Sequence, residues 1–379
     1  MRQRRLYMLI AGLVVAFLSI SAVRVDRLQL HVSFLTSPEL AGRRSGEPGA
    51  VKAAEYIANQ FRQAGFNTRM QEFGNNRRNV VANFGSAERH IVIGAHYDGQ
   101  AGFPSASDNA AGVAVLIELA SELKTINLPV SVVAIAFDDE EQGLNGSNFY
   151  VDHPVLPLEK TVAAIVFDTI GRHFLDLKNS TLFVLGTEYS RELAQIVERR
   201  GRPDMLVAGT DLIGPRSDFA GFARQKIPFL FFSHATHKDY HGPGDRPELL
   251  DYAKVVEDAQ AIGQMAADIA RLPKNPVYLD KPVYSPREAD TLLRIMSEIR
   301  RERKDLPRAY QMVFADLDQR IRTDRSRATL NVAASALLAL ATPRLSPFML
   351  EFLVAPAYQK DNKPEIVQAL REEAARWQQ

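Results

Sequence analysis

The sequence of 379 residues contains no cysteine. This absence excludes disulfide bonds, a thiolate nucleophile and metal sites built on cysteine. Any metal ion would therefore have to be held by histidine, aspartate or glutamate. Charge of one sign is also lacking, because the formal net charge is only +1. A chain this close to neutral has no bulk electrostatic attraction to nucleic acid, so we expect no nucleic-acid partner.

The N-terminus carries the layout of an export signal. Arg2, Arg4 and Arg5 precede an uncharged, mostly apolar stretch at residues 6–23. A positive segment followed by an apolar one is typical of a signal peptide, and 18 residues is the lower limit for a membrane span. We expect residues 1–28 to be a cleaved signal peptide or an uncleaved membrane anchor, with a buried core helix as the remaining alternative. The protein would then be exported, periplasmic or extracytoplasmic, and associated with the membrane through residues 6–23 if the segment stays attached.

Short apolar runs alternate with segments of helical periodicity along most of the chain. Residues 33–73 are expected to form a helical lead-in that includes a helix at 51–64. Strands are expected at residues 79–84, 90–95, 130–137, 162–167, 181–186 and 227–232, and helices at 110–124, 143–151, 188–200 and 249–271. This order predicts an α/β fold with a largely parallel or mixed central sheet sandwiched by helices. In such sheets, functional sites lie beyond the carboxyl ends of the strands.

A proline-rich segment divides the chain. Four prolines fall within residues 273–286, a composition typical of a linker. We therefore expect one domain at residues 29–275 and a helical C-terminal region at 276–379. Residues 328–341 are rich in alanine and leucine, but a polar residue interrupts them twice. A helix packed on protein is the favoured interpretation of this stretch, ahead of a second membrane span.

Side chains of the metal-binding type recur where predicted strands end. Each of five segments contributes at least one such residue: His96 with Asp98, Asp108, Glu140 with Glu141, Asp168, and His241. Imidazole and carboxylate groups suit zinc and similar divalent ions, and a carboxylate can touch two ions through its two oxygens. A neighbouring carboxylate that binds no metal can take a proton from water and pass it to a leaving group.

Each segment taken alone has a simpler explanation. A single buried histidine is usually a satisfied core residue, an aspartate before a helix such as Asp108 is usually an N-cap, and an acidic run is usually a solvated patch. Four of the five segments, however, leave predicted strands at what would be the same edge of one sheet. The set as a whole therefore predicts a metal site.

At these residues the sequence resembles peptidase family M28, the dizinc aminopeptidases. The resemblance covers roughly residues 33–272, and its motifs are specific in order and spacing together. They are the Leu-Ala-Gly-Arg of residues 40–43, His96-Tyr97-Asp98, Ser107-Asp108-Asn109-Ala110, residues 137–144 with Gly146-Ser147, Phe167-Asp168, and Tyr240-His241 followed by Asp245.

The resemblance implies a role for each candidate residue. Asp108 would bridge two metal ions, His96 and Asp168 would complete one site, and Glu141 and His241 the other. Glu140 would be the general base and then the proton donor, and Asp98 would hold the His96 ring in place, a role that physical reasoning also suggests. The peptide bond after Asp108 would be cis.

The sequence also departs from the family pattern. Phe219 stands where the family has a histidine, after Asp218, which puts a substrate contact from that position in doubt. His234 and His237 flank the last ligand segment and compete with His241, which we prefer for its Tyr-His-Gly-Pro context.

The resemblance implies a metal-dependent exopeptidase with two divalent ions, by default zinc. It would remove N-terminal residues from peptides with a free N-terminus, by attack of a water held between the two ions and deprotonated by Glu140. A glutaminyl cyclase that works with one zinc ion, and a carboxypeptidase of the same superfamily, are the alternatives. A scaffold domain that has lost its metals is disfavoured, because every expected ligand position is filled.

Overall fold

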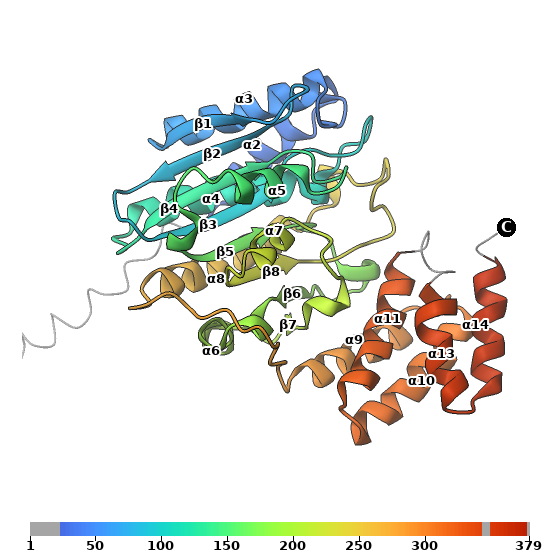
Figure 1. Ribbon diagram of the computed structural model, residues 1–379. Helices are drawn as coiled ribbons and strands as arrows, with labels where there is room; N and C mark the ends of the chain where they lie inside the picture. Colours follow the sequence, from blue (N-terminus) through green and yellow to red (C-terminus); the bar gives the residue numbers. More distant parts are fainter. Residues whose placement is uncertain (1–22, 343–348, 377–379) are drawn as a thin grey trace, which may run out of the picture.

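The computed structural model describes residues 23–342 and 349–376, and within them a mixed sheet forms the centre of the molecule (Figure 1). The order of its eight strands is β1-β2-β4-β3-β5-β8-β6-β7. In chain order the strands are β1 (Asn67–Glu72), β2 (Arg78–Phe84), β3 (His90–His96), β4 (Ser131–Phe137), β5 (Thr161–Phe167), β6 (Leu182–Leu185), β7 (Met205–Val207) and β8 (Phe229–Ser233).

Helices cover both faces of this sheet. Those of the first 270 residues are α2 (Val25–Leu35), α3 (Pro48–Gln63), α4 (Ala111–Thr125), α5 (Asn145–Asp152), α6 (Arg191–Arg200), α7 (Phe219–Arg224) and α8 (Tyr252–Ala270). Those that follow the proline-rich segment are α9 (Glu288–Glu302), α10 (Arg308–Thr323), α11 (Arg327–Ala341), α13 (Ala355–Lys360) and α14 (Pro364–Arg376). The predicted helix-covered α/β fold with a helical C-terminal region is confirmed.

The four central strands run parallel to one another. β3 pairs in parallel with β4 and with β5, and β5 pairs in parallel with β8. The pairs β1–β2, β2–β4 and β6–β8 are antiparallel, so the sheet is mixed. Because β4, β3, β5 and β8 share one direction, their carboxyl ends meet at one edge of the sheet, and whatever follows them is brought together there.

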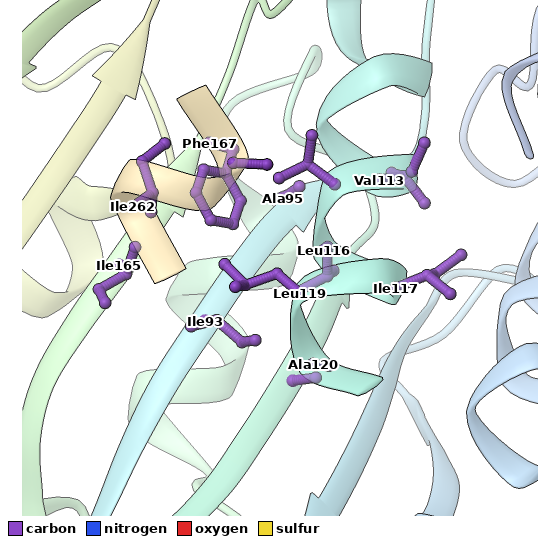
Figure 2. Packing of buried hydrophobic residues seen from close by; sticks show 14 of the residues in the cluster. Ile93, Ala95, Val113, Leu116, Ile117, Leu119, Ala120, Ile165, Phe167 and Ile262 are labelled. Atoms are coloured by element: carbon purple, nitrogen blue, oxygen red, sulfur yellow. The ribbon is translucent and has the colours of Figure 1, made fainter. Parts of the chain in front are cut away.

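Alternating side chains of the central strands face two separate apolar clusters. In β3, Ile93 and Ala95 point to the face covered by α4 and α8, whereas Val92 points to the opposite face. Figure 2 shows Ile93, Ala95 and Phe167 of the strands packed beneath the leucine side chains of α4 and beside Ile262 of α8. This period of two is what a strand buried on both faces requires.

Two strands were not predicted. Residues 67–72 belong to the expected helical lead-in, but they form β1, so this part of the prediction is wrong. The segment Asn-Thr-Arg-Met-Gln-Glu has one large apolar residue, and it is a strand because its backbone pairs with β2 along the edge of the sheet. β7 has three residues and is fixed by parallel pairing with β6.

The C-terminal helices share an apolar cluster with the sheet. Phe183 of β6 and Leu206 of β7 belong to the same cluster as Leu292 of α9 and Leu337 of α11. The predicted packed helix at residues 328–341 is present as α11. None of the helices in the described part of the chain is both long and apolar enough to span a bilayer. Of the predicted signal or anchor segment, residues 1–22 lie outside the described residues, whereas residues 25–28 form the first turn of α2. The division at residue 275 stays a prediction.

Candidate metal centre

The carboxyl ends of the parallel strands bring the predicted ligands to one place. His96 is the last residue of β3, Asp168 directly follows β5, and Glu140 and Glu141 follow β4 after two further residues. The loop after β8 carries His241 to the same edge. Asp108 arrives from the segment that leads into α4. All the residues proposed from the sequence as ligands or as the base thus lie together.

Asp108 lies between the two histidines. Its Oδ1 is 3.2 Å from Nε2 of His96, and its Oδ2 is 2.9 Å from Nε2 of His241. The backbone around it is fixed, because the carboxylate of Asp245 accepts hydrogen bonds from the N–H groups of Ser107 and Asp108 at 3.0 and 3.2 Å. The Asp108–Asn109 peptide bond is cis, as the resemblance implied. One carboxylate therefore faces both halves of the site.

The ligand-type atoms form two groups. Those of His96, Glu140 and Asp168 lie within 4.8 Å of one another, and so do those of Asp108, Glu141 and His241. In the first group, His96 Nε2 is 3.3 Å from Asp168 Oδ1, and in the second, His241 Nε2 is 3.1 Å from Glu141 Oε2. Two groups of three, with Asp108 also close to His96, could hold two ions that share one carboxylate.

Several of these atoms are buried without a hydrogen-bond partner. They are Oδ2 of Asp108, Oε1 of Glu141 and Nε2 of His241. Two of the three, His241 Nε2 and Asp108 Oδ2, lie 2.9 Å from each other as an ion pair. Buried polar atoms are costly when unpaired, so three of them converging in one place fit a bound cation. The residues present therefore suit a divalent metal ion.

The titration behaviour of the site indicates excess negative charge. Burial would lower the pKa of His241, but the carboxylates of Asp108 and Glu141 raise it to about 10. Burial likewise opposes charge on His96, yet Glu140 and Asp168 raise the pKa of its ring well above the usual 6.5. Burial and the charge of Asp108 raise the pKa of Glu141 to about 7. Without a metal ion, these histidines and Glu141 keep their protons to a higher pH, and the protons reduce the negative charge of the site. A divalent cation would neutralise the same carboxylates in their place.

Asp98 connects the end of β3 to the end of β4. Nδ1 of His96 is hydrogen-bonded to the backbone carbonyl of Asp98 at 3.2 Å, and Oδ1 of the Asp98 side chain lies 3.5 Å from the same nitrogen. The same carboxylate accepts hydrogen bonds from the backbone N–H groups of Glu140 at 3.1 Å and Glu141 at 3.2 Å. This second function was not predicted. It makes Asp98 a positioning residue for three candidate ligand or base residues at once.

The competing histidines do not join the site. His234 accepts a hydrogen bond from the N–H of Gly171 through Nδ1 and lies 3.0 Å from Asp258 through Nε2. His237 Nε2 lies 2.8 Å from the hydroxyl of Ser107. His241 is the histidine that reaches Asp108, as preferred from the sequence. The imidazoles at 234 and 237 instead hold the surrounding loops.

The neighbours of the two glutamates have structural partners. Asp138 accepts a hydrogen bond from the N–H of Arg78, and Asp139 pairs with the guanidinium of Arg77 at 2.6 Å. Asp218 is buried close enough to His96 for the two charges to interact, and burial raises its pKa to about 7. Phe219, in the place of the family's histidine, stacks on Phe229 with ring centroids 5.1 Å apart and belongs to the core.

Two buried supports of the site were not recognised as such from the sequence. The Arg43 guanidinium donates to backbone carbonyls of Leu35, Tyr97, Pro104 and Ser105, so it ties the β3 exit to the loop before Asp108. Asp245 fixes the backbone of that loop. Both stand in motifs that carry the family resemblance, which was the available signal. Apart from the bond between Arg43 and Leu35, the contacts named here join residues more than fifty positions apart and follow from no local pattern.

Comparisons with known proteins concern the family and the fold. The model of peptidase family M28 matches residues 79–266. Leucine aminopeptidase 2 of Trichophyton equinum is 27% identical over 225 residues, which cover 51% of this chain and 45% of that protein. The chain thus spans less than half the length of this curated relative.

Solved structures share the fold. A zinc aminopeptidase from Bacillus subtilis superposes with a TM-score of 0.58 at 15% identity, covering 68% of this chain and 98% of that one. A glutaminyl cyclase of Porphyromonas gingivalis superposes with a TM-score of 0.55 at 18% identity, covering 64% and 97%. At these identities the likeness concerns the fold alone.

Proposed function

The chain belongs to peptidase family M28 through residues 79–266, and we propose that it is a metal-dependent aminopeptidase. The observation that carries the proposal is the convergence of six ligand-type side chains, three of them with unpaired buried atoms, beyond the parallel strands. The curated relative of the same family named leucine aminopeptidase supports peptides as the substrate class.

We propose two divalent ions, with zinc as the default. His96 and Asp168 would hold one, Glu141 and His241 the other, and Asp108 would serve both, which its two short contacts to the histidines support. Divalent ions bound there would polarise the scissile carbonyl and make water a better nucleophile at neutral pH.

The chain's own residues would perform the proton transfers. Glu140 lies in the group with His96 and Asp168, and its backbone is fixed by Asp98. Its carboxylate would take a proton from the attacking water and return it to the departing amine. Burial raises the pKa of Glu140 well above its usual range, with Asp168 adding to this and His96 opposing it. A carboxyl group poised in this way can serve first as base and then as acid.

A panel of aminoacyl p-nitroanilides tests the proposal. Purified full-length protein should release nitroaniline, lose this activity on dialysis against a chelator, and regain it with added zinc. The proposal fails if the protein hydrolyses none of the panel, or if the activity survives complete removal of metal.

A glutaminyl cyclase is the second candidate, supported by the shared fold with the Porphyromonas gingivalis enzyme. That reaction would convert an N-terminal glutamine to pyroglutamate. Metal content per chain, together with an assay for pyroglutamate formation on a glutaminyl peptide, separates the two activities. Two ions and no cyclisation would favour the aminopeptidase.

We further propose that the protein is exported. The support is the arginine-rich start before the apolar residues 6–23. Fractionation of cells that make the full chain, with N-terminal sequencing of the product, tests both export and cleavage. Recovery of uncleaved chain in the cytoplasmic fraction would contradict the proposal.

A further inference from the structure

A cavity of about 820 Å³ opens beside Asp168 and His241. One side of it is formed by the family domain, with Phe183 of β6 and Phe231 of β8 among its lining residues. The opposite side is formed by the last turns of α11, residues 337–342, with Tyr310 of α10. In Figure 1 the C-terminal helices lie beside the β6–β7 edge of the sheet, with α9 and α11 on the side toward it. The C-terminal helices α10 and α11, which lie outside residues 79–266, therefore form one wall of a cavity that is lined on its other side by the candidate ligands Asp168 and His241.

The interior of this cavity is apolar. Leu338, Leu340 and Ala341 are only half-buried, unlike Leu337 and Ala339 next to them, so they present apolar surface to the open space. Some of the charged groups around the cavity are paired: Arg303 pairs with Asp305 at 2.8 Å, and the carboxylate of Asp176 accepts the backbone N–H of Lys238 at 3.0 Å. The exposed Arg216 is also among the lining residues, but apolar side chains make up most of the lining. The space is therefore suited to an apolar group of a ligand rather than a charged one.

The wall is fixed to the loop that leads to His241. The hydroxyl of Thr236 donates to the carbonyl of Ala341 at 2.8 Å, and Thr236 lies between β8 and His241. On the far side, Glu302 at the end of α9 accepts the N–H of Lys178 at 2.7 Å. These hydrogen bonds fix the position of α11 relative to the candidate metal centre.

We propose that α11 forms the selectivity wall of the substrate cavity, and that the cavity receives a bulky aliphatic or aromatic side chain at the N-terminus of the peptide. The inference rests on the proposed aminopeptidase function. The physical reason is geometric. If the N-terminal residue of the peptide is bound next to Asp168 and His241, its side chain extends into this apolar cavity, and α11 limits the size of the side chain that fits. A pocket of this kind discriminates substrates by the apolar surface they bury.

Two substitutions of Leu338 test whether α11 limits the size of the cavity: Leu338→Trp should narrow it, and Leu338→Ala should widen it. Leu338→Trp should lower the ratio of kcat/KM for phenylalanyl over alanyl p-nitroanilide by about tenfold or more. Leu338→Ala should raise that ratio. Val332→Ala is the matched control, because Val332 is a half-buried apolar residue of the same helix that does not line the cavity, and its ratio should equal that of the wild type. An unchanged ratio in both Leu338 variants, with a wild-type thermal midpoint, overturns the inference and leaves the aminopeptidase proposal intact.

A binding measurement separates this inference from the proposed function. Calorimetry with n-octanol, a neutral apolar probe, should show binding to the wild type and to Val332→Ala, and weaker binding to Leu338→Trp. If no aminoacyl substrate is hydrolysed, the proposed function fails, and octanol binding alone decides whether α11 walls an apolar site. Should Leu338→Trp fail to fold, Ala341→Leu narrows the same wall and carries the same expectations. Equal octanol binding by the wild type and the narrowed variant would contradict the inference.

Discussion

The carboxylates of Asp98 and Asp108 show how single residues organise the candidate site. Asp108 turns one oxygen toward each histidine, at 3.2 and 2.9 Å, while Asp98 holds one histidine ring and two backbone amides. The partners named here are the last residue of β3, the two glutamates after β4 and a histidine in the loop after β8. Substitution of either should therefore disturb the chemistry before it disturbs the fold.

Glu140→Gln removes the proposed base while keeping the shape of the side chain. We expect kcat to fall about 10²–10⁴-fold, because glutamine cannot accept the proton, with zinc content per chain unchanged. Steady-state kinetics and elemental analysis measure the two quantities. Glu88→Gln, at an exposed position paired only with Lys160, is the control and should be silent. If Glu140→Gln turns over at nearly the wild-type rate, the base is another group, and if it loses metal, Glu140 is a ligand.

Asp98→Asn replaces a double acceptor by a group with one acceptor. The amide oxygen can keep one of the N–H groups of Glu140 and Glu141, but the NH₂ would face the other. We expect metal affinity or activity to fall about 10–100-fold. Competition with a chromogenic chelator measures the affinity. Asp152→Asn, whose side chain pairs with Arg224 at the surface, is the matched control. Wild-type affinity and activity in Asp98→Asn would show that the link between β3 and β4 is only structural.

At the scale of elements, the sequence predicted the bounds of those strands whose burial produces a continuous apolar run. The central strands β3, β4 and β5 lie within one residue of their predicted bounds, because each is an apolar run buried on both faces. The edge strands β1 and β7 were missed, since their strand geometry comes from pairing with β2 and β6 rather than from their own residues. Local pattern thus predicts central elements and misses those that depend on a neighbour.

Gly94 tests the packing of β3 against β4. A Cβ at this position would lie 2.5 Å from Cε2 of Phe137, so the buried ring would have to move. We expect Gly94→Ala to lower the free energy of unfolding by about 1–3 kcal/mol, measured by urea denaturation. Gly221→Ala is the matched control, because the nearest atoms to its Cβ are 3.4 Å away and it lies in a helix, where alanine is favoured. Equal stability of the two variants would mean that β3 and β4 separate at little cost.

The ligand residues were predicted, but most of their supports were not. His96, Glu140, Glu141, Asp168 and His241 could be proposed because metal-binding side chains recur after predicted strands, and Asp108, which precedes a helix, because it completes the set. The family resemblance supplied their division into two sets and the support of His96 by Asp98, because residue patterns do not contain three-dimensional distances. The contacts of Asp245 and Arg43, and the wall supplied by α11, each join segments far apart in the chain. They became visible only when the fold brought those segments together.

At the scale of the whole molecule, the candidate site makes stability depend on pH, because its carboxylates lie close together and a bound cation would neutralise them. Glu141 has its pKa raised from 4.5 to about 7, and His241 from 6.5 to about 10. Both shifts mean that these two groups bind more protons in the metal-free folded chain than in the unfolded chain. The stability that each group contributes is fully present below its unfolded pKa and is lost as the pH rises through its folded pKa. The sign is therefore the same for the glutamate and the histidine.

We therefore expect Glu141 and His241 to make the metal-free protein lose stability relative to the zinc-loaded protein between about pH 4.5 and pH 10, at about 1.4 kcal/mol per pH unit for each extra proton that they hold in the fold. Bound ions displace these protons, so the zinc-loaded protein should lack this slope and gain about 2.7 kcal/mol at a free metal concentration of 100 times Kd. Urea unfolding at pH 5, 7 and 9, with chelator and with zinc, measures both effects. Because the rest of the chain titrates equally in the two samples, the difference between them reports the site alone. Identical slopes in the two samples would show that these carboxylates and imidazoles are not the groups that a cation neutralises.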